Sequence, residues 1–443
     1  NIMLNRRKRL MLIGSIAVVS LLAYGLIPLE SKRFSIKVDQ KLAKGKKDFL
    51  RSVPPTSADS SAQNVIWIIL DDLSLADTDL YVEGPVAVPN LNKLADEGVK
   101  FTNAYVTSPV CSPSRAAIMT GRYNQRFGFE HQMHERYLKN RLEYFGFKYL
   151  IDSGPWEPQY QTEVPNFSTM RSMGLPESEI TLAEIAKRAN YNTGYIGKWH
   201  LGKKKSKSPR AFGFDHFYGF YSSHSLYAPE TDPEIVSQRI EDDFTDEYIW
   251  EGGRNDLQAI RLNDKEIKEE RYLTEAITEE SISFIRQYKD VPFYLVVSYN
   301  APHTPLQAKK EYVAMYNDEK DPIKRVHYAM IKCLDDQLGK LMASLEHNNL
   351  SNNTLVMLIS DNGGAEYNLT TSNGPYQGGK ITNFEGGVKV PMLMRYPGMA
   401  PERTIYPHPV HATDLFATSL DVIGLNPPSD RRYDGENLLD HIG

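Results

Sequence analysis

The stretch "NVIWIIL" (residues 64–70) is followed at once by Asp71 and Asp72. A short, nearly continuous apolar run rich in β-branched residues is typical of a strand that is buried on both faces. Comparable β-rich runs occur at residues 193–197, 292–299, 354–360 and 390–396. Helical patterns lie among them at residues 90–98, 181–189 and 323–347. This alternation predicts an α/β fold with a large, mostly parallel central sheet flanked by helices.

Charged or metal-binding side chains follow four of these runs. In open α/β sheets, ligands bind outside the carboxyl ends of the strands. We therefore expect the following residues to meet at one edge of the sheet: Asp71, Asp72, Lys198, His200, His303, Asp361 and Asn362.

The pairs Asp71-Asp72 and Asp361-Asn362 suggest a metal site. Neighbouring carboxylates repel one another unless a cation lies between them. The alternatives are a helix cap for the first pair and a tight turn for the second. Together the pairs offer four hard oxygen donors, which suit Ca²⁺ or Mg²⁺ better than zinc. No HxxxH or CxxC pattern indicates a zinc site.

The stretch "SPVCSPSRAAIMTGRY" carries Cys111 in front of a short helical pattern. Pro113 can occupy the first helical position and Gly121 can end the helix. A helix N-terminus favours negative charge and activates a thiol, and Arg115 can point back at the same spot. The alternative is a small buried hydrophobic residue. We interpret the stretch as a site for an anionic group.

Composition limits the class of protein. The chain has 443 residues, of which 41% are hydrophobic, and a net charge of -5. It can build a large core, and its mild acidity argues against a general nucleic-acid binder. The two cysteines indicate no disulfide framework. Cys333 lies inside the helical pattern at 323–347, where a core role is expected.

The N-terminal residues differ from the rest. A basic "NRRKR" precedes twenty uncharged residues at 10–29, which is the positive-inside pattern. Residues 1–29 are therefore an uncleaved membrane anchor or a signal peptide with "AYG" at 23–25 as its cleavage site. In both cases the following chain is exported, as a periplasmic or membrane-anchored protein. Residues 30–61 are interpreted as a polar linker.

Several motifs together resemble one enzyme family. "CSPSR" (111–115) matches the C-x-P-S-R signature of the type I sulfatases, formylglycine-dependent and arylsulfatase-like members of the alkaline-phosphatase-like superfamily. "NYNTGYIGKWHLG" (190–202) resembles the second family signature, with Asn190 where glycine is usual. "ILDDL", "APHTP", "SDNGG" and "GGK" occur in family order. The resemblance implies a sulfatase catalytic domain over residues 62–443 with that fold.

The resemblance also implies a mechanism. In that family a maturase oxidises the motif cysteine to formylglycine, whose hydrate is the nucleophile. The implied substrate is a sulfate monoester, on a sulfated sugar or an aryl group, and the products include inorganic sulfate. A covalent sulfo-hemiacetal forms and then collapses. A serine could not collapse in this way.

The implied roles follow residue by residue. Cys111 would become the aldehyde, and Arg115 would hold its hydrate. Lys198 and Lys380 would grip sulfate oxygens, His303 would protonate the leaving oxygen, and His200 would drive the collapse. The implied Ca²⁺ ligands are Asp71, Asp72, an oxygen of residue 111, Asp361 and Asn362.

Two other functions are compatible with parts of the pattern. One is a phosphoester hydrolase of the same superfamily, which commonly uses Thr or Ser with two zinc ions. The other is a catalytically silent protein that binds sulfated glycans. The cysteine in C-x-P-S-R and the intact matched positions favour the sulfatase.

Some stretches leave alternatives open. The lysine-rich "GKKKSKSPR" (202–210) could hold a polyanionic chain or be a solvated loop. The aromatic "FGFDHFYGFYSSH" (212–224) could stack on sugar rings, but core packing is the preferred interpretation. Phe384 and Lys389 stand where the family more often has another aromatic and an arginine. The small C-terminal antiparallel subdomain usual in the family is expected to be truncated after "DGENLLDHIG".

Overall fold

The computed structural model describes residues 6–31, 36–55, 62–133, 138, 140–150, 164–165, 167–240 and 244–442. It divides into two compact units. The smaller unit consists of Asn1–Lys37, His134–Met173 and Glu241–Thr245. The larger unit consists of Val38–Met133, Gly174–Ile240 and Asp246–Gly443.

The described residues of the larger unit form a ten-stranded sheet. The strands lie in the order β10 (Lys265–Glu266), β9 (Arg261–Leu262), β7 (His216–Phe220), β6 (Asn192–Lys198), β11 (Phe293–Pro302), β2 (Asn64–Asp71), β13 (Thr354–Ser360), β14 (Met392–Arg395), β3 (Val99–Phe101) and β15 (Thr404–Tyr406). The five strands β7, β6, β11, β2 and β13 run parallel. Two short pairs flank this sheet: β8 (Ile235–Gln238) with β12 (Leu306–Lys309), and β4 (Ala104–Tyr105) with β16 (Val410–His411).

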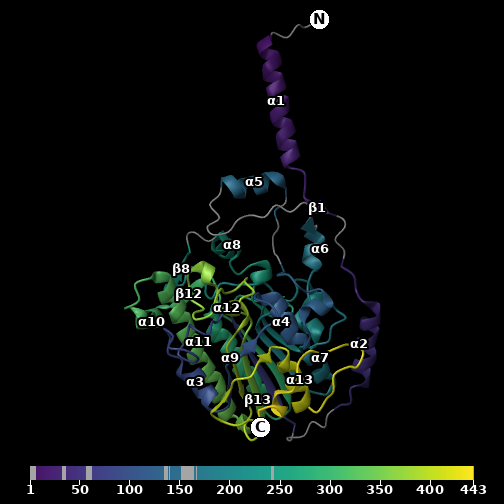
Figure 1. Cartoon of the computed structure of the whole chain (residues 1–443), viewed down its shortest axis with the longest axis vertical. Helices are drawn as coiled ribbons and strands as arrows, with labels where there is room; N and C mark the ends of the chain where they lie inside the picture. Colours follow the sequence, from purple (N-terminus) through teal and green to yellow (C-terminus); the bar gives the residue numbers. More distant parts are fainter. Residues whose placement is uncertain are drawn as a thin grey trace. The chain divides into compact units, whose positions relative to one another are not determined.

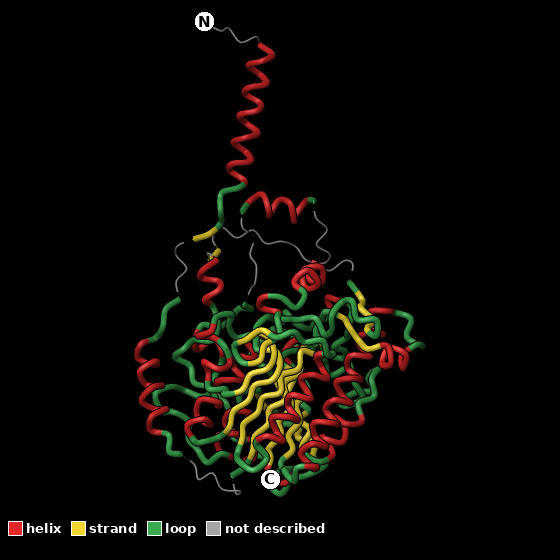
Figure 2. Tube along the Cα trace, turned by 180° about the vertical axis from the view of Figure 1, so that it is seen from behind, coloured by secondary structure: helices red, strands yellow, loops and turns green. Residues whose placement is uncertain are grey.

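Strand β2 lies near the middle of the sheet and is buried along its whole length. Its alternate side chains enter two separate cores. Val65 and Trp67 face one core, whereas Ile66 and Ile68 face the other. Because both faces of the strand are covered, its sequence is apolar throughout rather than alternating. Figure 2 shows helices packed along the strands.

Helices cover both faces of the sheet (Figure 1). One face carries α3 (Pro89–Asp96), α9 (Leu273–Gln287) and α11 (Pro322–His347). The other carries α4 (Cys111–Thr120), α7 (Leu182–Arg188) and α13 (Asp414–Val422). Shorter or peripheral helices are α2 (Gln40–Ser52), α8 (Phe244–Gly252), α10 (Lys310–Val313) and α12 (Glu385–Val388).

The predicted architecture is confirmed. Each of the five apolar runs forms a strand, and each of the three helical patterns forms a helix. The run at 390–396 becomes β14, which is antiparallel to β13, so the sheet is mixed at this side. Cys333 is buried in α11 as expected.

The polar-linker interpretation of residues 30–61 is wrong for Gln40–Ser52, which form helix α2. Asp39 caps this helix by accepting a hydrogen bond from the backbone amide of Leu42. Phe49 and Leu50 pack against the core, and Lys46 pairs with Glu184 of α7 at 2.6 Å. The apolar residues have helical spacing, but abundant lysines make the segment polar on average.

The smaller unit contains α1 (Arg6–Gly25), β1 (Glu30–Ser31), α5 (Arg141–Tyr149), β5 (Val164–Pro165) and α6 (Phe167–Ser172). Strands β1 and β5 pair in parallel. Among the described helices, α1 alone is long and apolar enough to cross a membrane, judged by length and composition. Its window Lys8–Gly25 is 6% buried within the protein.

Candidate active site

Cys111 is the first residue of α4, whose ten residues are all buried. The prediction that Cys111 lies at a helix N-terminus is confirmed, but the helix starts two residues earlier than expected. Pro113 is therefore the third helical residue and not the first. Proline is tolerated there because first-turn amides have no partner within the helix. Gly121 ends the helix as predicted, with a left-handed φ of 66°.

The two aspartates at the end of β2 lie beside Cys111 and two lysines. The Cys111 Sγ is 3.5 Å from Asp71 Oδ1 and 3.9 Å from Asp72 Oδ1. Lys198, the last residue of β6, donates to Asp71 Oδ2 at 2.5 Å. Lys380 donates to Asp72 Oδ2 at 2.8 Å. The neighbouring carboxylates are thus each paired with an ammonium group.

Arg115 links α4 to three strands of the sheet. Its Nε donates to Asp361 Oδ2 at 2.6 Å, and its Nη1 donates to the Lys198 carbonyl at 3.0 Å and to Ser298 Oγ at 2.6 Å. Its Nη2 lies 3.9 Å from Asp71 Oδ2 and has no hydrogen-bond partner among the described residues. One cationic donor is therefore left over in a buried site.

A metal could be held between these groups. Asp71, Asp72, Cys111 and His303 each offer a ligand atom, and these atoms lie within 4.8 Å of one another. Asn362 donates to Asp72 Oδ1 at 2.6 Å, while its own Oδ1 is buried and has no hydrogen-bond partner in the described chain. An orphaned buried amide oxygen beside carboxylates fits a hard cation.

The two predicted histidines are both buried in this region. His303 makes a 2.6 Å hydrogen bond from Nδ1 to the Thr304 carbonyl, and its Nε2 lies 3.7 Å from Asp72 Oδ2. Both ring nitrogens of His200 have no hydrogen-bond partner among the described residues. Burial lowers the pKa of each histidine well below its usual range, and nearby lysines lower it further. Both rings are therefore neutral in the free site.

Burial also controls the acids of the site. It raises the pKa of the Cys111 thiol well above its usual range, and the Asp361 carboxylate adds to that rise. The unmodified thiol is therefore neutral and a poor nucleophile. Burial raises the pKa of Asp71 to about 7 against the opposing effect of Lys198. For Asp72 burial acts in the same direction, but Lys380, His303 and Lys198 outweigh it and lower the pKa.

The structure thus brings together, through direct side-chain contacts, Asp71, Asp72, Cys111, Arg115, Lys198, His303, Asp361, Asn362 and Lys380. His200 is buried two residues after Lys198, and burial together with the charges of Lys198 and Arg115 lowers its pKa. All of these residues belong to the larger unit.

Sequence reasoning missed two supporting residues, Ser298 and Tyr195. Both hydroxyls donate to the backbone carbonyl of Lys198, at 2.7 Å and 2.6 Å. They lie inside apolar strand runs, where a single hydroxyl gives no distinctive signal. A polar residue in a strand buried on both faces is the one available hint, because buried polar groups need partners.

The departure at Asn190 has a structural reason. Its φ is 63°, in the left-handed region that glycine adopts most easily. Asparagine is among the few other residues that tolerate this conformation. The substitution therefore keeps the turn that leads into β6.

The structure decides part of the role of the two stretches for which the sequence left alternatives, residues 202–210 and 212–224. In 202–210, Lys207 is buried and pairs with Glu177, and Arg210 pairs with Asp264 at 3.1 Å. These two residues serve the fold, and polyanion binding by the remaining lysines stays a prediction. In 212–224 the core interpretation is confirmed by four buried rings, those of Phe212, Phe214, Phe217 and Phe220.

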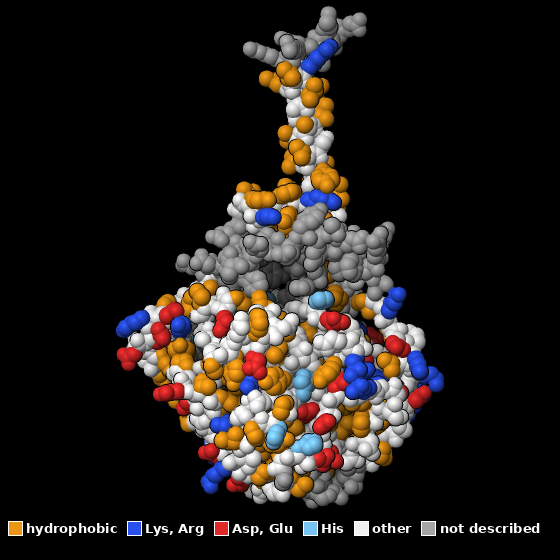
Figure 3. Space-filling view, viewed as in Figure 1, with side chains coloured by type: hydrophobic (Ala, Val, Ile, Leu, Met, Phe, Trp, Pro, Cys, Tyr) orange, Lys and Arg blue, Asp and Glu red, His pale blue; other side chains and the backbone are white. Residues whose placement is uncertain are grey.

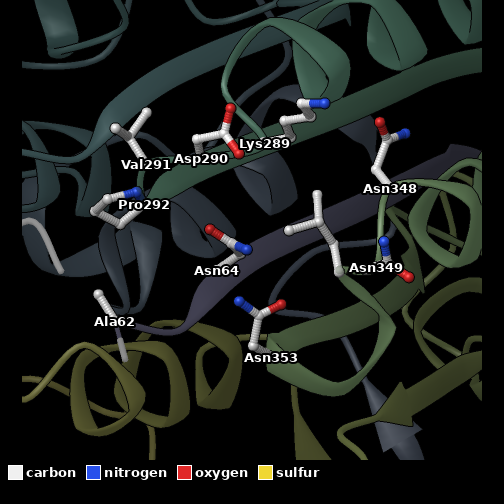
Figure 4. Close-up of a pocket in the computed structure, with 10 residues that line it drawn as sticks. Ala62, Asn64, Lys289, Asp290, Val291, Pro292, Asn348, Asn349 and Asn353 are labelled. Carbon is white, nitrogen blue, oxygen red and sulfur yellow. The ribbon is translucent and has the colours of Figure 1, made fainter. Parts of the chain in front are cut away.

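A separate depression of about 450 Å³ lies at the opposite edge of the sheet (Figure 4). It is lined by residues such as Asn64, where β2 begins, and Pro292, just before β11. Asn348, Asn349 and Asn353 complete much of its wall. None of the ten predicted site residues lines it.

A family model described as Sulfatase matches residues 63–425, and the chain therefore belongs to the sulfatase family. The N-acetylgalactosamine-6-sulfatase of Homo sapiens is 33% identical over 383 residues, which are 85% of this chain and 65% of that protein. The chain thus spans just under two thirds of that relative's length. Arylsulfatase H of Canis lupus familiaris is 30% identical over 86% of this chain and 72% of its own length.

Solved structures agree with the family. The protein Ps i-CgsB, solved in complex with k-i-k-neocarrahexaose, superposes with a TM-score of 0.68 and 31% identity over 86% of this chain and 76% of its own. The PsFucS1 sulfatase from Pseudoalteromonas sp. has a TM-score of 0.63 at 24% identity, over 91% of this chain and 75% of its own, and supports the fold. The predicted resemblance and the alkaline-phosphatase-like sulfatase fold are confirmed.

Proposed function

We propose that this chain hydrolyses sulfate monoesters on sulfated carbohydrates and releases inorganic sulfate. The observation that carries the proposal is the position of Cys111. Its sulfur contacts both Asp71 and Asp72, and each of these carboxylates is paired with a lysine. This places a modifiable residue at a helix N-terminus, among cations that could hold an anion.

Two groups complete the proposed site. The oxygens of Asp71, Asp72, Asp361 and Asn362 would hold Ca²⁺, which would offset negative charge on a sulfate group and its attacking oxygen. A maturase would convert Cys111 to formylglycine. The hydrate of this aldehyde would supply the attacking hydroxyl, a role that the neutral thiol cannot fill. The orphaned Asn362 oxygen and the hard donor set support the first assignment.

The cationic side chains bind and orient the substrate. Lys198 and Lys380 end in ammonium groups within the site, and Arg115 has one unused N–H group there. The three cations balance the charges of Asp71, Asp72 and Asp361. A divalent cation on the carboxylates therefore leaves the site with the positive charge that a sulfate ester needs.

The histidines move protons. The Nδ1 of His303 is engaged by the Thr304 carbonyl, which leaves Nε2 to face the site near Asp72. A bound sulfate ester brings negative charge, favours protonation of this ring and lets Nε2 protonate the leaving oxygen. His200 is a neutral imidazole, and neither of its ring nitrogens has a hydrogen-bond partner among the described residues. It can therefore act as a general base.

The substrate class and the location rest on independent support. Relatives named for a sulfated amino sugar and a structure solved with a neocarrahexaose favour a sugar substrate. The apolar helix α1 with its basic flank favours export, with the catalytic unit outside the cytoplasm.

Release of inorganic sulfate tests the proposal. The whole chain, co-expressed with a formylglycine-generating maturase, is assayed on nitrophenyl sulfate and on sulfated oligosaccharides. Mass spectrometry of the peptide that contains Cys111 reports maturation. A fully matured chain that releases no sulfate from either kind of substrate would refute the function.

Replacing His303 by alanine should separate substrates by their leaving groups. We expect kcat/KM for a sugar sulfate to fall by about 10²–10⁴-fold and that for nitrophenyl sulfate by less than about tenfold, because a phenolate needs little protonation. His200→Ala is the matched control and should slow both substrates alike. Equal losses on both substrates for His303→Ala would show that His303 is not the acid.

Replacing Ser298 by alanine should lower kcat about tenfold with little change in KM, because the hydroxyl that accepts a hydrogen bond from Arg115 and donates one to the Lys198 carbonyl is lost. Tyr299→Phe is the control. It removes a buried hydroxyl from the next residue of β11, where Tyr299 bonds Thr278 instead of the site. Steady-state kinetics of both variants, with Ser298→Thr to restore the hydroxyl, distinguish positioning from general destabilisation. Equal losses in Ser298→Ala and Tyr299→Phe would contradict the role.

A further inference from the structure

Helix α1 has the surface of a helix that lies in lipid. It is 20 residues long, and the hydrophobic side chains along it are exposed in the described structure (Figure 3). About 20 apolar residues are what a helix needs to cross the hydrocarbon core of a bilayer. Its first four residues are basic, so its C-terminal end would emerge on the outer side.

A second helix, α5, lies against that C-terminal end. A Cβ atom on Gly25 would be 3.3 Å from the Cβ of Leu142, and the guanidinium of Arg141 lies 4.6 Å from the ring centre of Tyr24. Pro28 and Asn140 form a β-bridge just beside this contact. Figure 1 shows α5 lying across the foot of α1. Both helices belong to the smaller unit, so this contact is internal to it.

The exposed face of α5 is apolar and aromatic. Leu142, Phe145 and Tyr149 are spaced i, i+3 and i+7, so they share one side of the helix. Phe145 is 51% exposed, Tyr149 65%, and Leu150, directly after the helix, 86%. The rings of Phe145 and Tyr149 are stacked, with their centroids 6.0 Å apart. Exposure of such an apolar stripe to water would be unfavourable in free energy.

Cationic side chains accompany this stripe. Arg141 begins the helix and Lys148 lies near its end, where its ammonium group is 5.6 Å from the ring centre of Tyr149. Aromatic rings with flanking lysine or arginine are the side chains that favour the headgroup region of a bilayer. A helix that lies across a spanning helix is also parallel to the membrane plane, as interfacial helices are.

We propose that residues 141–150 form an interfacial membrane helix, held at the outer end of α1 and inserted through Leu142, Phe145, Tyr149 and Leu150 into the lipid headgroup region. The partner is a lipid bilayer, and the helix adds a second membrane contact to that of α1. The inference does not depend on the catalytic chemistry.

The contact also bears on the choice between anchor and signal peptide. The candidate cleavage motif at 23–25 includes Gly25, which is buried and lies against Leu142 of α5, and Tyr24, whose ring is in contact with the guanidinium of Arg141. Cleavage there would remove the helix against which α5 is seated. The α1–α5 contact therefore favours the uncleaved anchor.

Site-directed spin labelling tests the proposal in the whole chain. Cys111 and Cys333 are buried, so a nitroxide reagent labels new exposed cysteines selectively. Phe145→Cys, Tyr149→Cys and Leu150→Cys report on α5. Met315→Cys and Met399→Cys are matched controls, because these methionines are 60% and 61% exposed in the larger unit.

The labelled chains are inserted into vesicles of phosphatidylcholine and phosphatidylglycerol. We expect the three α5 labels to collide readily with oxygen, which concentrates in lipid, and poorly with a water-soluble nickel chelate. The two control labels should show the reverse. Nickel accessibility at the α5 positions equal to that at 315 and 399 would overturn the proposal, because α5 would then lie in water. Shielding from both reagents would also overturn it, because protein would then cover α5.

Discussion

Replacement of Cys111 by alanine is expected to abolish sulfate release while leaving the chain folded. Loss of a catalytic nucleophile typically costs on the order of 10⁶ in kcat. The thiol makes two long contacts to Asp71 and Asp72, so little structural support is lost with it. Sulfate release and thermal unfolding of the purified variant are the two measurements.

The chain supplies its own control for this variant. Cys333 is the other cysteine, and it is equally buried, but it lies on the core-facing side of α11. Cys333→Ala should cost on the order of 1 kcal/mol in unfolding free energy and leave turnover of the remaining folded protein unchanged. Near-normal activity in Cys111→Ala would disprove the formylglycine assignment.

Replacement of Asp361 by asparagine should weaken Ca²⁺ binding by at least about 10²-fold and lower kcat by a comparable factor. The reason is that a formal charge is removed from a donor set of three carboxylates and one amide. Arg115 also loses the shorter of its two ion pairs, keeping Asp71 at 3.9 Å, and weakening this buried pairing should lower stability. Calcium titration by calorimetry, with kcat measured over the same calcium range, gives both quantities.

Asp335→Asn is the matched control for that experiment. Asp335 is also a buried carboxylate, but it accepts hydrogen bonds from the backbone amides of Asn90 and Leu91 at the start of α3. Its neutralisation should lower stability without changing calcium affinity. Metal analysis that finds two zinc ions per chain in the wild type would contradict the calcium site altogether.

The arrangement of the sheet could be predicted from the sequence because its central strands are buried on both faces. β2, β11 and β13 must be apolar throughout, and their polar neighbours at the carboxyl ends then stand out. α2 was missed for the opposite reason. It packs through few residues such as Phe49 and Leu50, while its lysines dominate the local composition.

The site residues could be predicted from the sequence where a polar residue follows an apolar strand. They were harder to predict where a polar residue lies within such a strand. Asp71, His303 and Asp361 each follow an apolar run, and this position identifies them as candidate site residues. Ser298 lies within such a run, and only the folded structure places its hydroxyl between Arg115 and the Lys198 carbonyl. Contacts between residues so distant in the chain are set by tertiary packing, which strand and helix patterns do not encode.

The complete burial of Cys111 limits the time at which the proposed modification of this residue could occur. Its side chain is 0% exposed, and α4 is enclosed by the sheet and by α13. Once these elements have packed, a modifying enzyme has no access to the sulfur. The proposed oxidation would therefore have to precede folding. If Cys111 is the proposed formylglycine precursor, a chain that folds before it is oxidised keeps an inert thiol. The fraction of active molecules would then depend on the rate of oxidation relative to the rate of folding.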